Sequence, residues 1–289
     1  MRVFITGGSG YIGRATIDAL LRHGHQVTAL ARNDAAAGTV SGLGAESVRG
    51  DLTDTSLLRS AAEAADGVIH LAAPSGQHAP EQDQAASDAM RLGAAGKPYV
   101  HTGGSWIYGD THGVVEENAP FAPPQLVAWR LANEKRVLDS ATTGGRPVLI
   151  MPGIVYGQTG GGLIRAFYLD PARTAGAVPC IGEGANHWAV VHVEDVAELY
   201  VLALGAAPGS VYFGVNGEAP TQYAVAEALS TAAGHPGRIR SIDLDQARVE
   251  MGPIADAFTL DQQISNRRAV TELGWKPQHT DALAELAGS

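Results

Sequence analysis

A glycine-rich segment near the N-terminus has the composition of a phosphate-binding turn. It reads Thr6-Gly7-Gly8-Ser9-Gly10-Tyr11-Ile12-Gly13. Gly7 permits a tight turn, Gly10 lets the backbone approach a pyrophosphate, and Gly13 lets a helix pack close to a strand. The first turn of that helix offers free amide N–H groups and a positive dipole end to the phosphates. Because the motif joins an expected strand to an expected helix, it predicts a dinucleotide site rather than an empty glycine turn.

The elements that position this turn follow from the alternation of apolar strands and amphipathic helices. Strands are expected at 3–5, 26–31, 47–49, 68–71, 99–102 and 148–151, and helices at 11–23, from about 54, at 82–93 and at 124–142. Gly24 ends the first helix, and Asp54 suits an N-cap. This alternation predicts an α/β protein with a Rossmann-type, doubly wound parallel sheet covered by helices on both faces.

The regular alternation breaks after Gly157. Residues 157–186 are rich in glycine, whereas 188–204 again read as a strand and a helix, followed by a helix at 221–233 and a strand near 238–243. We therefore expect a nucleotide-binding domain at 1–156 with a return segment at about 187–215. A smaller C-terminal lobe, built from 157–186 and 216–289, is expected to bind a small-molecule substrate beyond the carboxyl ends of the strands.

The bulk composition excludes several partners. The net charge is -10 and the pI about 5.4, which argues against nucleic acid or an anionic membrane surface. Cys180 is the only cysteine, so no internal disulfide is expected and a reducing compartment fits. We see no signal peptide and no apolar run near the ~20 residues of a membrane span, and we expect a cytoplasmic protein.

Further motifs occur along the chain. They are Gly50-Asp51-Leu52, Val68-Ile69-His70-Leu71-Ala72-Ala73, Pro152-Gly153-Ile154-Val155-Tyr156-Gly157, Val191-His192-Val193-Glu194-Asp195-Val196-Ala197 and Glu272-Leu273-Gly274-Trp275-Lys276-Pro277. With the glycine turn, they make the chain resemble the extended short-chain dehydrogenase/reductase superfamily, specifically its NAD-dependent epimerase/dehydratase group, over nearly its whole length.

The resemblance implies a set of cofactor-binding residues. Asp51 and Leu52 would hold the adenine, whereas Leu71, Ala72 and Ala73 would line the ribose and the pyrophosphate. Segment 152–155 would lie beside the nicotinamide. The complete set is Thr6, Gly7, Gly10, Tyr11, Ile12, Gly13, Arg32, Asp51, Leu52, Leu71, Ala72, Ala73, Thr102, Arg130, Pro152, Gly153 and Val155.

The end of the second strand selects between NAD and NADP. An NAD enzyme usually offers a carboxylate to the ribose hydroxyls, and the family position for it is Ala31. Arg32 and Asn33 follow, and a guanidinium suits a 2′-phosphate. Asp34 lies close enough to keep NAD(H) as the alternative. We expect NADP(H).

The catalytic pattern of the family is missing. Redox members place a Tyr and a Lys four residues apart on the helix after the fifth strand, with a Glu four residues later, and the Lys lowers the Tyr pKa for proton transfer. Anchoring on Glu134 puts Arg130 at the Lys position and Leu126 at the Tyr position, and Gly104 stands where a Ser or Thr is usual. The chain therefore resembles atypical members of the superfamily, which lack the usual acid.

Four residues are candidates for the catalytic set. Ser105 could orient a substrate oxygen, Tyr108 and Tyr156 precede glycines at strand ends, and Arg130 keeps a positive charge near the nicotinamide ribose. Arg130 is a poor acid, and it could instead form a structural ion pair with Glu134 one helical turn away. We expect His192 to pack in the core, and no histidine spacing supports a metal site.

Three functions fit these observations. The first is an NADPH-dependent reductase with an unusual proton source, acting on an iminium or another activated substrate. The second is isomerisation, dehydration or cyclisation around bound NADP, and the third is a nucleotide sensor without chemistry. The sequence leaves the oligomeric state open, and the helices at 82–93 and 124–142, where many relatives dimerise, make a homodimer one alternative by analogy alone.

Overall fold

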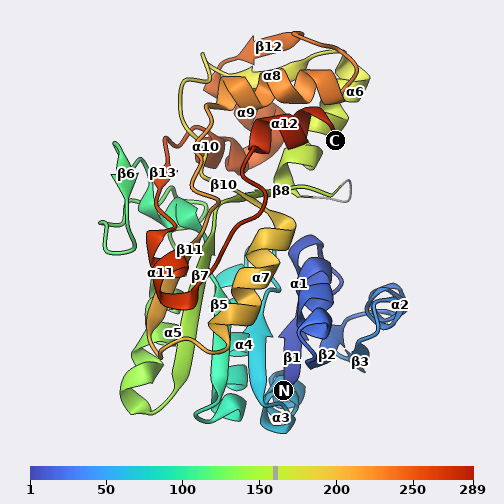
Figure 1. Cartoon of the computed structure of the whole chain (residues 1–289), viewed down its shortest axis with the longest axis vertical. Coiled ribbons are helices and arrows are strands. Elements are labelled where there is room, and N and C mark those ends of the chain that lie inside the picture. The colour runs from blue at the N-terminus through green and yellow to red at the C-terminus, as the bar shows by residue number, and fades with distance from the viewer. Residues whose placement is uncertain (159–161) are drawn as a thin grey trace.

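A seven-stranded parallel sheet forms the centre of the protein (Figure 1). The computed structural model describes residues 1–158 and 162–289. The strand order is β11-β7-β5-β4-β1-β2-β3. The strands are β1 (Arg2–Thr6), β2 (Gln26–Ala31), β3 (Glu46–Arg49), β4 (Gly67–His70), β5 (Pro98–Thr102), β7 (Arg146–Pro152) and β11 (Ser210–Gly214). The prediction of a Rossmann-type α/β fold is confirmed.

Helices cover both faces of this sheet, because successive residues of a buried strand point to opposite sides. On β1, Val3 and Ile5 belong to one core cluster and Phe4 to the other. The first cluster packs under α1 (Tyr11–Arg22), α2 (Asp34–Gly42), α7 (Val193–Ala203) and α11 (Arg267–Leu273). The second packs under α3 (Thr55–Ala64), α4 (Ala79–Ala94) and α5 (Arg130–Asp139).

Two predicted helix signals are confirmed and one helix boundary is wrong. Asp54 caps α3 by accepting the Leu57 amide at 3.1 Å, and Gly24, at φ +76°, follows α1. The helix expected at 124–142 begins only at Arg130. Residues 125–129 form successive turns, in which bonds reach back three residues, as from the Arg130 amide to the Val127 carbonyl. The tighter winding follows two adjacent prolines, 123 and 124.

The remaining elements gather around a third core cluster beyond one end of the sheet (Figure 1). Its strands are β9 (Val178–Ile181), paired with β12 (Ile239–Ile242), and β8 (Ile154–Tyr156), paired with β10 (Val190–His192). Its helices are η3 (Arg165–Leu169, a π-helix), α6 (Asp170–Ala175), α8 (Gln222–Ala232), α9 (Leu244–Met251), η4 (Gly252–Ile254), α10 (Ala255–Phe258) and α12 (Ala282–Ala287). This third cluster supports the division into two lobes, whose boundaries stay a prediction.

The remaining elements are short. They are η1 (Ser105–Tyr108), η2 (Ser140–Thr143) and the two-stranded pair β6 (Val114–Val115) and β13 (Gln263–Ile264). Within the described residues, no helix combines the length and the apolar character needed to cross a membrane.

Candidate active site

The glycine turn between β1 and α1 has the tight geometry that the motif predicts. Gly7 adopts φ +74°, and a Cβ there would lie 2.7 Å from the Ala72 amide nitrogen of the neighbouring strand end. A Cβ on Gly13 would lie 2.0 Å from the Gly7 carbonyl oxygen, so α1 can start here only with glycine at that position. Gly10 donates its amide to the Gly7 carbonyl at 2.9 Å. The turn therefore fixes where the N-terminus of α1 points.

A cavity of about 390 Å³ opens from this turn across the carboxyl ends of β1, β4, β5 and β7. Most of the predicted cofactor residues line it, together with two of the catalytic candidates. These are Gly7, Gly10, Tyr11, Ile12, Gly13, Leu71, Ala73, Thr102, Ser105, Arg130, Pro152, Gly153 and Val155. Its volume falls within the range of ligand pockets, and its position matches the expected crevice beyond the strand ends.

Thr6 and Ala72 support the turn from behind rather than line the cavity. The Thr6 hydroxyl accepts the Ala72 amide at 3.3 Å and lies 2.6 Å from Nδ1 of the buried His70. His70 in turn faces the buried carboxylate of Asp83, with Nε2 and Oδ1 3.5 Å apart. Asn133 of α5 donates to the same carboxylate at 3.1 Å. A buried polar chain thus runs from α5 and α4 to the strand ends beneath the turn.

The residues predicted for the adenosine end lie outside this cavity, at the ends of β2 and β3. The Asp51 carboxylate accepts the amide and the hydroxyl of Thr53, which shapes the loop, while Leu52 packs on the second core cluster. Arg32 is exposed directly after β2, and Asn33 caps α2 by accepting an amide at 2.8 Å. Among the described residues Arg32 forms no ion pair.

Arg49, which sequence reasoning missed, also reaches the end of β2. Its register partner on β2 is Ala31, and its guanidinium lies 3.3 Å from the carboxylate of Asp34. Asp34, whose carboxylate left NAD(H) as the alternative cofactor, is therefore paired with a neighbouring arginine. Only the parallel pairing of β2 with β3 brings these side chains together.

Arg130 and Glu134 do not form the ion pair that their spacing allows. In the described residues Arg130 has no carboxylate within ion-pair distance; it donates to the Thr102 carbonyl at 3.5 Å and lies 4.7 Å from the ring centre of Trp129. Glu134 is buried, and neither of its carboxyl oxygens has a hydrogen-bond partner in the part of the chain that the structure describes. The alternative of a structural ion pair with Glu134 is therefore wrong, and Arg130 instead contributes to the cavity wall.

Burial is the main reason why the Glu134 carboxyl is a weak acid. It raises the pKa of Glu134 to about 8, against the opposing charge of Arg130 and with the help of the negative Asp83. The carboxyl is therefore mostly neutral at pH 7. A side chain on the cavity-lining Gly103 would approach this carboxyl within 2.8 Å, so Glu134 lies directly behind the cavity wall.

These features, a glycine turn opening a crevice across a parallel sheet, match a known family. The family model for the NAD-dependent epimerase/dehydratase family matches residues 3–213. The chain belongs to this family.

Individual relatives and solved structures resemble this chain over nearly its whole length. An uncharacterized protein of Saccharomyces cerevisiae is 30% identical over 99% of this chain and 98% of its own length. The Thermus thermophilus UDP-glucose 4-epimerase in complex with NAD superposes with a TM-score of 0.78 at 22% identity, covering 100% of this chain and 98% of that one. A human epimerase family protein with NADPH gives a TM-score of 0.79 at 20% identity, with the same coverage. These two structural likenesses show the fold.

The hydroxyl groups proposed to replace the family's tyrosine are engaged elsewhere. Ser105 lines the cavity but is 2% exposed, and its hydroxyl donates to Gln262 at 3.2 Å. Tyr108 donates to the Glu117 carbonyl at 3.0 Å and Tyr156 to a backbone carbonyl at 3.4 Å, and neither tyrosine lines the cavity. These placements count against both tyrosines as proton donors.

Ile154, in the segment expected beside the nicotinamide, also lines the cavity. Further cavity residues were not named as site residues from the sequence. They are Gly103, Gly104, Trp106, Val127, Gly162 and Leu163. Val127 lies in the turns before α5, beside the position where the family places its tyrosine, and Gly162 packs on the ring of Tyr11. Tyr11 itself donates to the Gly157 carbonyl, and burial raises the pKa of its hydroxyl. None of these residues carries a local signal, because their meeting depends on tertiary structure.

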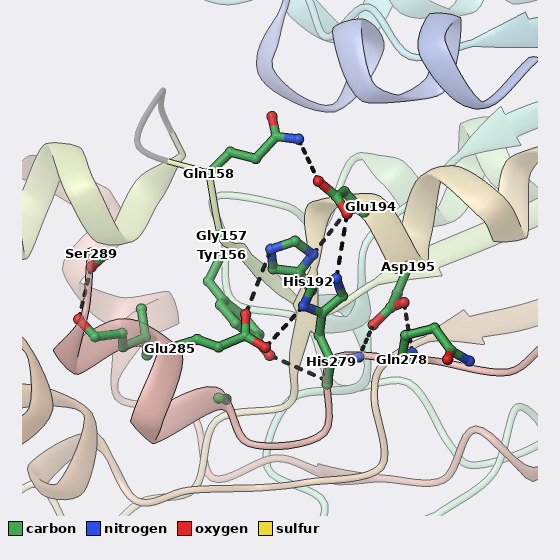
Figure 2. A network of polar contacts seen from close by, with 12 residues as sticks. Tyr156, Gly157, Gln158, His192, Glu194, Asp195, Gln278, His279, Glu285 and Ser289 are labelled. Carbon is green, nitrogen blue, oxygen red and sulfur yellow. Dashed lines mark hydrogen bonds and ion pairs between the residues drawn. The ribbon is translucent and has the colours of Figure 1, made fainter. Parts of the chain in front are cut away.

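A second polar cluster lies between the N-terminus of α7 and the C-terminal segment (Figure 2). His192 is buried as predicted, but it stacks on His279, and Glu194 completes a group whose ligand-type atoms lie within 4.8 Å of one another. Such a group was not expected from the histidine spacing. Two nearly parallel rings cannot both direct a nitrogen lone pair at one ion, so the cluster in this arrangement suits ion pairing better than metal binding.

Proposed function

We propose that the protein is an NADP(H)-dependent reductase of a small-molecule metabolite that does not use the tyrosine acid of its family. The cavity that joins the glycine turn to Arg130 carries this proposal, because it runs from the expected diphosphate site to the wall where a small substrate would meet the nicotinamide. Curated members of the family include reductases, epimerases and dehydratases.

The residues after β2 support NADP(H) over NAD(H). Ala31 stands where a ribose-binding carboxylate is usual, and the exposed Arg32 next to it has no ion-pair partner among the described residues. Arg49 holds the carboxylate of Asp34 at 3.3 Å. A 2′-phosphate would find an exposed guanidinium at this edge, next to a carboxylate that already faces Arg49.

The cavity supports a substrate that needs little acid catalysis. Its titratable side chains, among the described residues, are Tyr11 and Arg130. The pKa of Tyr11 is raised by burial, and a guanidinium stays charged. A substrate with a positive or otherwise activated carbon accepts a hydride without a strong acid beside it, and such a substrate fits this wall.

Two measurements test the proposal. Nicotinamide fluorescence during titration with NADPH and with NADH reports which cofactor binds. Loss of NADPH absorbance in proportion to product, across a panel of iminium and carbonyl compounds, supports a reductase. Turnover without that loss would favour isomerisation, dehydration or cyclisation around bound NADP instead, and tight binding without turnover would favour a nucleotide sensor.

A further inference from the structure

Arg130 presents a positive charge to a largely apolar cavity. Trp106, Val127, Ile154 and Leu163 contribute apolar surface to the same wall. Within the described residues, no aspartate or glutamate lines the cavity. Such a wall disfavours a ligand with a net positive charge. It favours a molecule with an apolar body and one negative group, which would also balance the charge of an iminium carbon.

The guanidinium retains most of its hydrogen-bonding capacity. Among the described residues the guanidinium donates one hydrogen bond, to the Thr102 carbonyl, which is long at 3.5 Å, and its central carbon lies 4.7 Å from the ring centre of Trp129. Arginine offers donors in a planar fork that matches a carboxylate, so an anion in the cavity would satisfy the donors that the protein leaves open.

Glu134 keeps the charge of Arg130 available. The two residues are one helical turn apart, yet they form no ion pair, and both oxygens of the buried Glu134 lack hydrogen-bond partners in residues 1–158 and 162–289. A neutral carboxyl at this position leaves the positive charge of the Arg130 guanidinium without a balancing negative charge. An ionised Glu134 would instead compete with any anion in the cavity for the field of Arg130.

We infer that Arg130 binds the carboxylate of an apolar organic acid, and that such acids are the substrate class of this cavity. This inference rests on the proposed function, since it takes the cavity to be the substrate site beside the nicotinamide. The diphosphate of the cofactor is the other source of negative charge. The amides of the glycine turn already serve a diphosphate, so the guanidinium remains for the substrate.

The test uses hexanoate and hexanamide as probes on the NADPH-saturated protein, followed by calorimetry. The two probes have the same chain and differ in charge, so hexanoate should bind at least about 10-fold more tightly if Arg130 pairs with the carboxylate. Arg130→Gln should abolish that difference, and it should weaken hexanoate binding far more than NADPH binding. Arg130→Lys, which keeps the charge without the fork, should retain part of the preference.

The outcomes separate this inference from the proposed function. Equal binding of hexanoate and hexanamide to a protein that binds NADPH would overturn the inference and leave the cofactor proposal standing. A loss of NADPH affinity in Arg130→Gln as large as the loss of hexanoate affinity would assign the guanidinium to the cofactor diphosphate, and would also overturn it. Failure to bind either nucleotide would instead refute the proposed function.

A pH series gives an independent test. The charged or titratable groups that influence Glu134 are Arg130 on α5, Asp83 on α4 and Tyr108 on η1. Because burial raises the pKa of Glu134 to about 8, hexanoate should bind more weakly as the pH rises through this value. Glu134→Gln stays neutral and should lose this dependence while keeping the preference for hexanoate. An unchanged pH profile in Glu134→Gln would contradict the role given to Glu134.

Discussion

The imidazole rings of His192 and His279 are stacked, with centroids 3.5 Å apart and 22° between their planes (Figure 2). Nδ1 of His192 accepts the Glu194 amide at 3.3 Å, so the ring proton lies on Nε2, 3.7 Å from a carboxylate oxygen of Glu285. Both nitrogens of His279 face carboxylates, Nδ1 that of Glu285 at 2.9 Å and Nε2 that of Glu194 at 3.4 Å. A protonated His279 therefore lies against a neutral His192.

This stack joins segments far apart in the sequence. His192 begins α7, His279 lies in the segment before α12, and a Cβ on Gly157 would fall 1.9 Å from the His192 ring. The Gly157 carbonyl in turn accepts the hydroxyl of Tyr11, which lines the cofactor cavity. The cluster thus fastens the C-terminal segment to the elements that border the cavity.

His279→Gln should lower stability more at acidic than at alkaline pH. Burial alone would lower the pKa of His279, but the carboxylates of Glu285, Asp195 and Glu194 outweigh it and raise the pKa. A raised pKa adds stability below the unfolded value of about 6.5, and that stability is lost as the pH rises through the folded value. The partly exposed pairs limit the effect to about 1 kcal/mol.

Urea unfolding at about pH 5.5 and about pH 8.5 checks this prediction. The difference in midpoint between the native protein and His279→Gln should be larger at the lower pH. His78→Gln, which replaces an exposed histidine outside the cluster, serves as the control and should not change the midpoint at either pH. A difference that grows with pH would contradict the charge state assigned to His279.

Arg32→Ala should weaken NADPH binding by at least about 10-fold and NADH binding by less than about threefold, because only NADPH carries the 2′-phosphate. Fluorescence titration with each nucleotide measures both constants. Arg59→Ala is the matched control, since Arg59 is exposed on α3 and pairs with Glu63 at 3.0 Å. Equal losses for the two nucleotides would remove Arg32 from 2′-phosphate recognition.

The fold was largely predictable because its signals are local. The strands, the glycine turn and the Asp54 cap depend on residues close in sequence. Helix α2 escaped prediction because Gly38 and Gly42 weaken its helical pattern, while the Asn33 cap and packing of Val40 on the core stabilise it. The sequence pattern also predicted that α5 would begin at residue 124. The helical pattern continues through 124–129, but the backbone there turns more tightly.

The site was predictable only where the motif is contiguous. The glycine turn was found from the spacing of its residues. The directions of the Tyr108 and Tyr156 hydroxyls depend instead on carbonyl partners in other loops. His192 and His279 are 87 residues apart, so no periodicity pointed to their stack. The neutral state of Glu134 could not be predicted from the sequence, because it follows from the burial of the carboxyl. The i,i+4 spacing by itself favours an ion pair with Arg130.

Gly13→Ala should abolish NADPH binding and destabilise the protein, because the added Cβ would lie 2.0 Å from the Gly7 carbonyl oxygen. Relief of this clash requires the turn to open and α1 to shift. Gly38→Ala is the control: it also adds one methyl group to a helix, but no atom lies within 4 Å of the new Cβ. It should keep NADPH affinity and raise stability by up to about 1 kcal/mol. Similar affinities in both variants would refute the steric role of Gly13.

The last prediction concerns Asp83, whose buried carboxylate supports the cofactor turn through His70. Burial alone would raise the pKa of Asp83, but the nearby His70 and His101 rings and the Asn133 amide hold it well below its usual range. A depressed pKa adds stability above the unfolded value of about 3.9, and this contribution is lost as the pH falls through the folded value.

Asp83→Asn should therefore cost about 2–4 kcal/mol at pH 7, because it weakens a buried, charge-assisted network. It should also reduce NADPH affinity several-fold, since the hydroxyl of Thr6, which holds the Ala72 amide, lies 2.6 Å from His70. Urea midpoints and NADPH titration measure the two effects. Glu81→Gln, on the exposed side of the same helix, should change neither, and a stability loss without any loss of affinity would uncouple the buried chain from the cofactor turn.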